Sequence, residues 1–420
     1  MSAKQVQSIT DTILTSYHAR VVNKETYFFV EGSWHHSARK LDELIVAIDR
    51  KTTRADRAEI RDLVSLSAPD GEFAPGNYIA FANGNLDIET MRLTDPSPDL
   101  IVPNPIPWEW DATATSGAVE DYLDSTAAND PSVRTRIEEM LGCCLYRGDA
   151  PYIFVLVGAA PVADGNASNG KSTLIRVATG AVGEDNAQSV DIHVLGERFV
   201  AASLRGALVD VSSDTESSKP TAASLSVLKR ASSTDPIDSD VKNGARIRFK
   251  SYATFIIAAN RVPGFLVDAG LRSRTVPIPL KAKFPRHGAD PSSVILTPEH
   301  MPALLALAVR GLKRLLADGP SPCSDGDEAF GSIVALSSTV EQWVDEKDID
   351  AASLHGEPVM SSYSGYDAWC YSAGSKAVPK IEFELEVQNR FPALAIKKCR
   401  FQGKSTTRRW IDLAQPATKY

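Results

Sequence analysis

Apolar positions along the chain fall into blocks with two different periods. Between residues 150 and 285, continuous apolar runs typical of buried strands alternate with segments of helical spacing. The three strongest runs cover residues 152–157, 207–211 and 254–259. Chains with this alternation fold into three-layer α/β units with a mainly parallel sheet. We therefore predict an α/β class with one such unit at its centre.

The regions on either side of this unit have shorter or helical patterns. Asn83 and Gly84 separate two apolar runs and favour the tight turn of a hairpin. Prolines between residues 96 and 107 indicate an extended connector, and helical spacing over 119–145 indicates a collar. Downstream, the pattern predicts an apolar helix at 302–316, a linker at 318–322 and a helix at 332–344.

The last 60 residues predict a small separate module. Helices are expected around 363–370 and 381–390, followed by two strands on either side of Gly403. This order suggests a winged-helix-like DNA-binding domain. The expected domains are an N-terminal α+β region at 1–115, a helical collar at 116–149, the α/β domain at 150–318 and the C-terminal module at 330–420.

The composition describes a chain without membrane spans. It has 420 residues, of which 43% are hydrophobic, and a formal net charge of -8. No apolar run approaches the roughly 18 residues of a membrane helix. The N-terminus lacks the apolar core of a signal peptide, so we expect an intracellular protein. The five cysteines form no C-x-x-C pair, which predicts reduced packing residues rather than a zinc site or disulfides.

Positive charge is concentrated near the C-terminus although the total charge is acidic. Residues 397–409 contain six cationic side chains and no acidic one. Because salt limits the reach of each charge to about 10 Å, local charge decides where a phosphate backbone docks. A solvated basic edge and a DNA contact explain this run equally well. The six residues are Lys397, Lys398, Arg400, Lys404, Arg408 and Arg409.

One motif in the α/β unit indicates phosphate chemistry. Residues 165–172 match the phosphate-loop pattern G-x-x-x-x-G-K-[ST] between a strand-like run and a helix-like segment. Glycines let backbone N–H groups surround a polyphosphate, and the following helix N-terminus adds favourable partial charge. Lys171 is expected to reach the β- and γ-phosphates, and Ser172 to hold Mg²⁺. The alternative is a Gly/Asn-rich surface turn. The predicted nucleotide-binding residues are Gly165, Asn166, Ala167, Ser168, Asn169, Gly170, Lys171, Ser172 and Thr173.

Hydrolysis also needs a carboxylate at the metal and its water, on a second strand. The run that begins at residue 207 is followed by Asp214 and Glu216, at the strand end where open α/β sheets bind ligands. We expect Asp214 to hold Mg²⁺ and the water, with Glu216 assisting. Asp210, inside the run, is the second choice for this role. A capping Asp and a solvated Glu in a polar loop are the structural alternative.

Two further segments carry polar residues at strand ends. Asn260 follows the run at 254–259, where its amide can hydrogen-bond the γ-phosphate or the attacking water, although such an Asn is more often a turn residue. Arg272 and Arg274 precede another strand-like segment. Arginines at such positions are often surface charges, but in a ring one of them would stabilise transition-state charge on a neighbouring subunit's nucleotide.

A cationic hairpin is expected between the second and third strands. Asn243 and Gly244 predict its turn, Lys242 lies at the tip, and Arg246, Arg248 and Lys250 lie on one arm. Such a hairpin can bind the backbone of a nucleic acid strand. An ordinary exposed hairpin is the alternative.

The order of these parts resembles the superfamily 3 AAA+ DNA helicases, in particular the phage and plasmid primase-helicase branch related to poxvirus primase-helicases. The similarity rests on Asn-Gly-Lys-Ser-Thr at 169–173, Leu-Arg-Gly at 204–206 before the strand that ends in Ser-Asp, Ala-Ala-Asn-Arg-Val-Pro at 258–263, and residues 272–279. It extends upstream to 78–87 and to Leu141-Gly142, and downstream to 366–370 and the basic tail. It thus covers roughly residues 75 to 415.

The resemblance implies an ATP-dependent replicative DNA helicase of a phage, prophage or plasmid. Such proteins form hexameric rings that hydrolyse ATP with Mg²⁺ while moving on single-stranded DNA, here in a bacterial host cytoplasm. It implies Walker roles for Lys171, Ser172 and Asp214, and a sensor role for Asn260. Arg274 would be the finger acting in trans, with Arg272 a close second. Lys242 would be the DNA-contacting tip of the hairpin.

Three departures from the family pattern matter. The approach to the phosphate loop, residues 159–164, is longer than usual, and Asp214 stands where a Glu is common. The chain also lacks room for the primase domain often fused upstream, so a separate primase or replication initiator is an expected partner. Two other readings stay open, namely a DNA-binding replication initiator or loader with little unwinding, and a P-loop kinase or other metabolic ATPase.

Overall fold

The computed structural model describes residues 1–158, 167–213, 220–233, 235–242, 244–260, 262–285, 290–337, 339–373 and 375–414. The chain divides into two compact units, Met1–Asp327 and Glu328–Tyr420. Across the described residues, no helix has both the length and the apolar character needed to cross a membrane. All five cysteines are free, and four of them are buried, as expected of packing residues.

The first unit begins with a small α+β region that has its own core. An antiparallel sheet in the order β1-β2-β3 packs with three helices. Buried apolar side chains from the helices and from Phe28 fill the space between them. The elements are α1 (Ala3–Ser16), β1 (Arg20–Val22), β2 (Glu25–Val30), β3 (Ser33–His35), α2 (Ala38–Ile48) and α3 (Arg54–Ser67).

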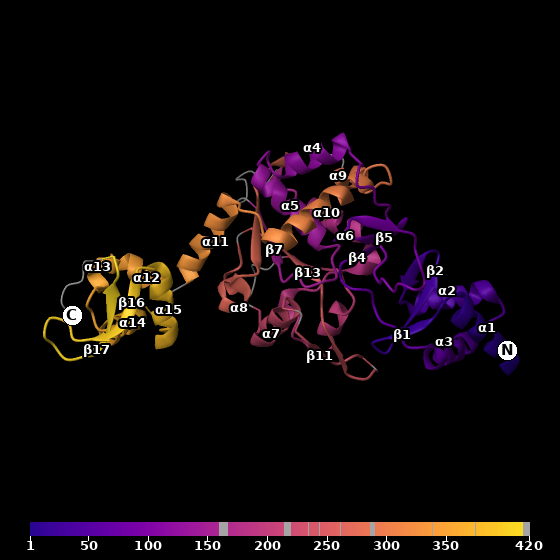
Figure 1. The fold of residues 1–420 in the computed structure, drawn as a ribbon, viewed down its shortest axis with the longest axis horizontal. Helices are drawn as coiled ribbons and strands as arrows, with labels where there is room; N and C mark the ends of the chain where they lie inside the picture. The colour runs from indigo at the N-terminus through magenta and orange to yellow at the C-terminus, as the bar shows by residue number, and fades with distance from the viewer. Residues whose placement is uncertain are drawn as a thin grey trace. The chain divides into compact units, whose positions relative to one another are not determined.

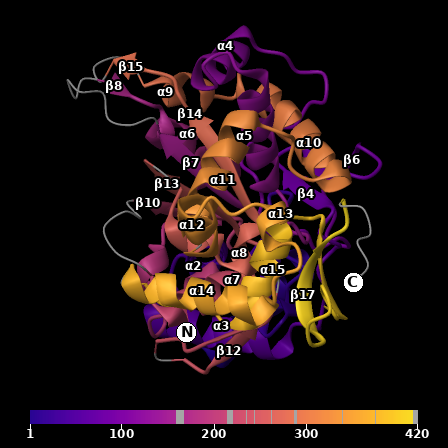
Figure 2. The same ribbon diagram turned by 90° about the vertical axis from the view of Figure 1, so that its left-hand side faces the viewer.

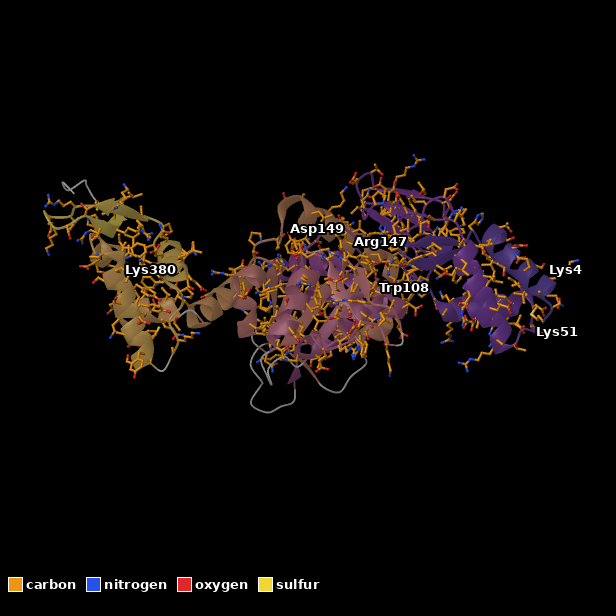
Figure 3. All side chains as sticks on the ribbon, turned by 90° about the horizontal axis from the view of Figure 1, so that it is seen from below. Lys4, Lys51, Trp108, Arg147, Asp149 and Lys380 are labelled. Atoms are coloured by element: carbon orange, nitrogen blue, oxygen red, sulfur yellow. The ribbon has the colours of Figure 1, made fainter. Side chains whose placement is uncertain are left out.

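The predicted hairpin around Asn83 and Gly84 is confirmed. β4 (Tyr78–Phe81) pairs antiparallel with β5 (Gly84–Asp87), and a third strand, β6 (Arg92–Thr94), extends the sheet. The proline-rich connector then leads to Trp108, whose Nε1 donates to the carbonyl of Gly180 at 2.8 Å. Arg147 donates to the carbonyls of Ala74 and Pro75 at 3.3 and 3.2 Å, and Figure 3 labels both Trp108 and Arg147. These bonds attach the N-terminal region to the α/β core.

The helical collar consists of α4 (Gly117–Thr126) and α5 (Pro131–Cys143), and α5 packs closely against α10 (Met301–Asp318). A Cβ at Gly142 would lie 2.1 Å from the carbonyl oxygen of Ala308, and one at Gly311 would lie 2.5 Å from backbone atoms of Glu138. The two helix backbones therefore touch, and only glycine fits at these two positions.

The predicted linker at 318–322 is fixed to the collar. Ser321 donates its N–H to Glu139 at 3.1 Å, and Arg136 donates to the Ser321 carbonyl at 2.8 Å. Arg314 forms an ion pair of 3.0 Å with the buried carboxylate of Glu139. These residues all belong to the first unit, and the division of the chain falls after Asp327.

A five-stranded sheet forms the centre of the first unit, and all its neighbouring strands are parallel. This confirms the predicted parallel α/β sheet, and β13 has the predicted bounds. Its order is β14-β7-β13-β10-β9, so numbered along the chain the strands run 5-1-4-3-2. The strands are β7 (Ile153–Gly158), β9 (Ala187–Gln188), β10 (Val209–Ser213), β13 (Thr254–Ala259) and β14 (Thr275–Leu280).

Both faces of this sheet are covered, which explains why the strands read as apolar runs. One face buries Phe154, Leu156, Ile256 and Val211 in the largest core cluster, together with residues of α5, α6 (Lys171–Val182) and α10. Alternate positions such as Val155 face the other side. Figure 1 shows α5, α6 and α10 above β7 and β13, with α7 (Ala222–Ala231), α8 (Ala269–Arg272) and β11 (Ile237–Ser239) below.

Short elements complete this unit. A second antiparallel pair joins β8 (Ala167–Ser168) to β15 (Phe284–Pro285), and β11 pairs with β12 (Ile247–Phe249). The remaining elements are the 3-10 helices η1 (Glu184–Asn186), η2 (Ile192–Val194), η3 (Ala201–Leu204) and η4 (Gly264–Val267), and helix α9 (Pro291–Ile295).

The second unit contains helices and one antiparallel hairpin around an aromatic core. Trp343, Tyr366, Phe383 and Trp410 are buried together. Both helices predicted for this region and the two strands flanking Gly403 are present, and Figure 2 shows α14 and α15 beside β17. The elements are α12 (Thr339–Glu346), α13 (Ala351–Leu354), α14 (Val359–Ser372), α15 (Lys380–Arg390), β16 (Leu394–Cys399) and β17 (Thr407–Asp412), preceded by α11 (Ser324–Ser337).

Candidate nucleotide and nucleic acid site

The second half of the phosphate-loop motif forms the start of α6. Gly170 caps the helix with φ +79, a left-handed conformation that favours glycine, and a Cβ there would lie 3.0 Å from the Phe284 ring. Lys171 is the first residue of the helix, and the exposed Ser172 follows. The N–H groups of a first helical turn form an anion-binding site. Of the other predicted loop residues, Gly165 and Asn166 lie outside the described residues.

Lys171 reaches the carboxyl edge of the central sheet. Its Nζ donates to Oδ1 of Asn260 at 3.0 Å, and Asn260 directly follows β13. A Cβ at Gly158, the last residue of β7, would lie 2.2 Å from the same Nζ. The structure therefore brings together two predicted site residues, Lys171 at the start of α6 and Asn260 directly after β13. Gly158 was not among the predicted residues; its position directly after an apolar run was the only sign of it in the sequence.

Of the three predicted acidic residues, the structure describes only Asp210. Asp214 and Glu216 lie outside the described residues, although β10 ends at Ser213 beside Ala258 of β13. Asp210 lies within β10, fully buried, and pairs in register with Phe255. Among the described residues, no group of three or more His, Cys, Asp and Glu side chains is arranged to hold a metal ion.

Asp210 is not at the edge where Lys171 lies. One of its oxygens, Oδ1, accepts the N–H of Val190 at 3.0 Å, and Oδ2 has no hydrogen-bond partner in the described part of the chain. Burial raises the pKa of this carboxyl to about 7, although the Val190 N–H acts in the opposite direction. Asp210 thus fastens the segment after β9 to β10 and lies inside the protein rather than at its nucleotide edge.

The two candidate arginines differ in their surroundings. Arg272 is exposed at the end of α8, and its guanidinium has no hydrogen-bond or ion-pair partner among the described residues. Arg274 is partly buried, and its Nη1 donates to the carbonyl of Lys229 at 2.9 Å and to Ser232 Oγ at 3.1 Å. Both acceptors lie at the C-terminal end of α7.

A hairpin is present as β11 and β12, paired from Ile237 with Phe249 to Ser239 with Ile247. The strands leave seven residues between them, more than the tight Asn-Gly turn predicted, and Arg246 and Lys250 lie just outside β12. Asn243, the predicted turn residue, lies outside the described residues. The cationic side chains on the hairpin and its loop are exposed; they are Lys242, Arg246, Arg248 and Lys250. Four exposed cations on one hairpin make a surface suited to a phosphate backbone.

The basic tail forms the hairpin β16–β17. Its cationic side chains differ in exposure and in their partners. Lys397 and Lys398 are exposed on β16, and Arg408 is exposed while pairing with Glu384 at 2.8 Å. Arg409 is only 7% exposed and donates to the carbonyl of Gly356. Its guanidinium is used inside the second unit, so we remove Arg409 from the predicted DNA-binding set.

Comparison with known proteins found a family model that matches part of the chain and solved structures with a similar fold. Residues 163–274 match the model of a family of unknown function, DUF5906. No curated protein matches the chain. An apo structure of the C-terminal region of NrS-1 (A form) matches with a TM-score of 0.53 at 12% identity, covering 96% of this chain and 99% of that chain. A second one, of NrS-1 residues 305–718, has a TM-score of 0.48 at 11% identity, with 96% and 98% covered. The first of these shows a fold shared over almost the whole of both chains.

Proposed function

We propose that this chain is an ATP-dependent DNA helicase of a phage, prophage or plasmid replication system, of superfamily 3 AAA+ type, which works as a hexameric ring. The observation that carries the proposal is the 3.0 Å bond from Lys171 to Asn260. P-loop ATPases use a lysine for the terminal phosphates and a polar side chain to orient the attacking water. Here two such groups, 89 positions apart in the sequence, meet at the end of the parallel strands.

The position of this pair in the sheet supports the same conclusion. β7, which leads into the phosphate loop, lies between β13 and β14, and both of these strands come later in the chain. Ligands of open α/β sheets bind outside the carboxyl ends of the strands, where the strand order changes direction. The nucleotide is therefore expected over β7, with the start of α6 as the phosphate cradle.

Each residue has a distinct expected task. The N–H groups at the start of α6 hold the phosphates, and Lys171 moves from Asn260 to the terminal phosphates when nucleotide binds. The Asn260 amide then hydrogen-bonds the attacking water. The exposed Ser172 hydroxyl suits Mg²⁺, which neutralises charge on the phosphates when bound. The exposed hairpin carrying Lys242 binds single-stranded DNA through its backbone, which makes affinity depend on salt.

The test is ATP turnover by the purified chain with and without single-stranded DNA, together with strand displacement on a forked duplex. We expect turnover that rises with DNA, and its loss in Lys171→Ala, while Lys313→Ala, an exposed lysine of α10, behaves as wild type. A particle that stays monomeric with nucleotide and DNA would overturn the ring. ATP turnover indifferent to DNA would instead indicate a metabolic kinase.

A replication initiator or loader is the second candidate. The observation that favours it is the exposed basic edge of β16 in a compact second unit, which is suited to duplex DNA. This candidate predicts tight ATP and DNA binding with little turnover and no strand displacement.

A further inference from the structure

The C-terminal end of α7 is held by a side chain from the start of β14. Arg274 Nη1 donates to the Lys229 carbonyl at 2.9 Å and to Ser232 Oγ at 3.1 Å. The last carbonyls of a helix have no partner within the helix, and a cation near them is also favoured by the helix dipole. The Arg274 guanidinium is therefore engaged within its own chain.

A second polar link joins the same two elements. Lys229 Nζ forms an ion pair of 2.8 Å with Asp268, which also caps α8 by accepting the N–H of Gly270 at 2.9 Å. Residues 268–274 are thus attached to α7 at both of their ends. We name the four residues Lys229, Ser232, Asp268 and Arg274 the α7–α8 bracket.

Arg272 lies between the two attachments of the bracket. It is the last residue of α8, exposed, and without a hydrogen-bond or ion-pair partner in the described part of the chain. An arginine held in this way by fixed neighbours is free to contact a group outside its own chain. Arg274 differs, because its Nη1 is already bound at the end of α7.

A turn directly after α7 connects the bracket to the cationic hairpin. The N–H groups of Ser233 and Asp235 both donate to the Arg230 carbonyl, at 3.2 and 3.1 Å. This turn leads directly to Ile237, the first residue of β11, which is 1% exposed. Figure 1 shows α7, α8 and β11 on one side of the sheet.

The main chain of Arg274 completes the connection. Its carbonyl accepts the N–H of Ile153, the first residue of β7, at 2.8 Å. One residue therefore contacts the strand that leads to the phosphate loop through its backbone and the helix that leads to the hairpin through its side chain.

We propose that Arg274 is a positioning residue that couples the cationic hairpin to the nucleotide strand, and that Arg272 alone reaches the nucleotide of a neighbouring subunit. This inference rests on the proposed helicase function. It gives Arg272 the finger role that the resemblance assigned first to Arg274, and it gives Arg274 a positioning role instead. Breaking the bracket should uncouple DNA binding from hydrolysis, whereas removing Arg272 should stop hydrolysis itself.

The test compares Arg272→Gln with Arg274→Gln, and uses Arg310→Gln, an exposed arginine of α10, as the control. Arg272→Gln should lower turnover by about a thousandfold or more, the range for an arginine finger, with nucleotide binding kept. Mixing it with Lys171→Ala subunits should restore activity. Arg274→Gln should keep basal turnover, lose its stimulation by single-stranded DNA, and show no rescue by Lys171→Ala.

Two milder variants separate positioning from folding. Ser232→Ala removes one acceptor with Arg274 intact, and Asp268→Asn keeps the α8 cap while weakening the ion pair. Both should reduce DNA stimulation without changing basal turnover, and Arg274→Lys should retain part of it. These variants decide the matter if Arg274→Gln fails to fold.

The outcomes separate failure of this inference from failure of the proposed helicase function on which it rests. In one contrary outcome, Arg274→Gln loses basal turnover and regains it when mixed with Lys171→Ala subunits. That result would identify Arg274 as the finger and overturn the inference, while the proposed helicase function would stand. Unchanged DNA stimulation in the folded Arg274→Gln, or in both milder variants, would also overturn it. Absence of DNA-stimulated turnover in the wild type would overturn the proposed function itself.

Discussion

The buried carboxyl of Asp210 makes the stability of the first unit depend on pH. An unfolded Asp loses its proton near pH 3.8, whereas in the folded chain the pKa is raised to about 7. Between these values the folded state binds more protons than the unfolded state, so stability is fully present below the unfolded pKa and falls as pH rises to the folded pKa. The difference is about three pKa units at 1.36 kcal/mol each, or about 4 kcal/mol.

Asp210→Asn removes this dependence with little change of shape. The amide oxygen still accepts the Val190 N–H, and the amide cannot ionise. Its NH₂ group takes the place of Oδ2, which has no partner among the described residues, at a cost of about 1–3 kcal/mol. That cost applies at every pH. Relative to wild type, we therefore expect the variant to gain about 4 kcal/mol between about pH 4 and about pH 8.

The assay is urea unfolding of both proteins at the two pH values. Tryptophan fluorescence would report unfolding of both units, because the second unit has tryptophans of its own. Hydrogen exchange of the buried backbone amides of β10 and β13 reports the first unit alone and is the better probe. Asp238→Asn, an exposed carboxyl on β11, is the control and should shift stability equally at both pH values. Parallel stability curves for wild type and Asp210→Asn would refute the reasoning.

Two glycine substitutions test the packing around the site. In Gly158→Ala the new Cβ meets the mobile amine of Lys171 at 2.2 Å, so we expect weaker ATP binding by calorimetry with little change in melting temperature. A lower melting temperature with unchanged ATP affinity would contradict this. In Gly142→Ala the Cβ meets the rigid carbonyl of Ala308 at 2.1 Å, so urea unfolding should show a loss of about 3 kcal/mol. Gly117→Ala, with open space around it, is the control and should be neutral; equal stability of the two variants would show that α5 can move away.

The strands of the central sheet were predictable because they are buried on both faces. The bounds of β13 coincide with the predicted run at 254–259, and the Asn-Gly turn identified the β4–β5 hairpin. β9 was missed because it contains only two residues, too few for any period. A short edge strand is defined by its neighbour rather than by its own composition.

The side-chain partners of the site could be predicted only in part. The sequence placed Lys171 in the loop after one strand and Asn260 at the end of another, and parallel strands bring such segments to the same edge of a sheet. The partners of Arg274 include a backbone carbonyl 45 positions away, and a carbonyl has no residue-type signature. Arg408 is exposed and the next residue, Arg409, is buried, but the four residues from Arg409 to Asp412 are all buried, so no alternation along β17 marked Arg409 in the sequence.

The contact between the backbones of α5 and α10 has a mechanical consequence. One helix brings the chain to the first strand of the sheet, and the other carries it away after the last. Because the two backbones are in contact at Gly142 and Gly311, moving one helix without the other would break close packing along this contact. We therefore expect α5, α10 and the central sheet to behave as one rigid body, so that relative motion within the first unit is confined to the elements on the other face of the sheet.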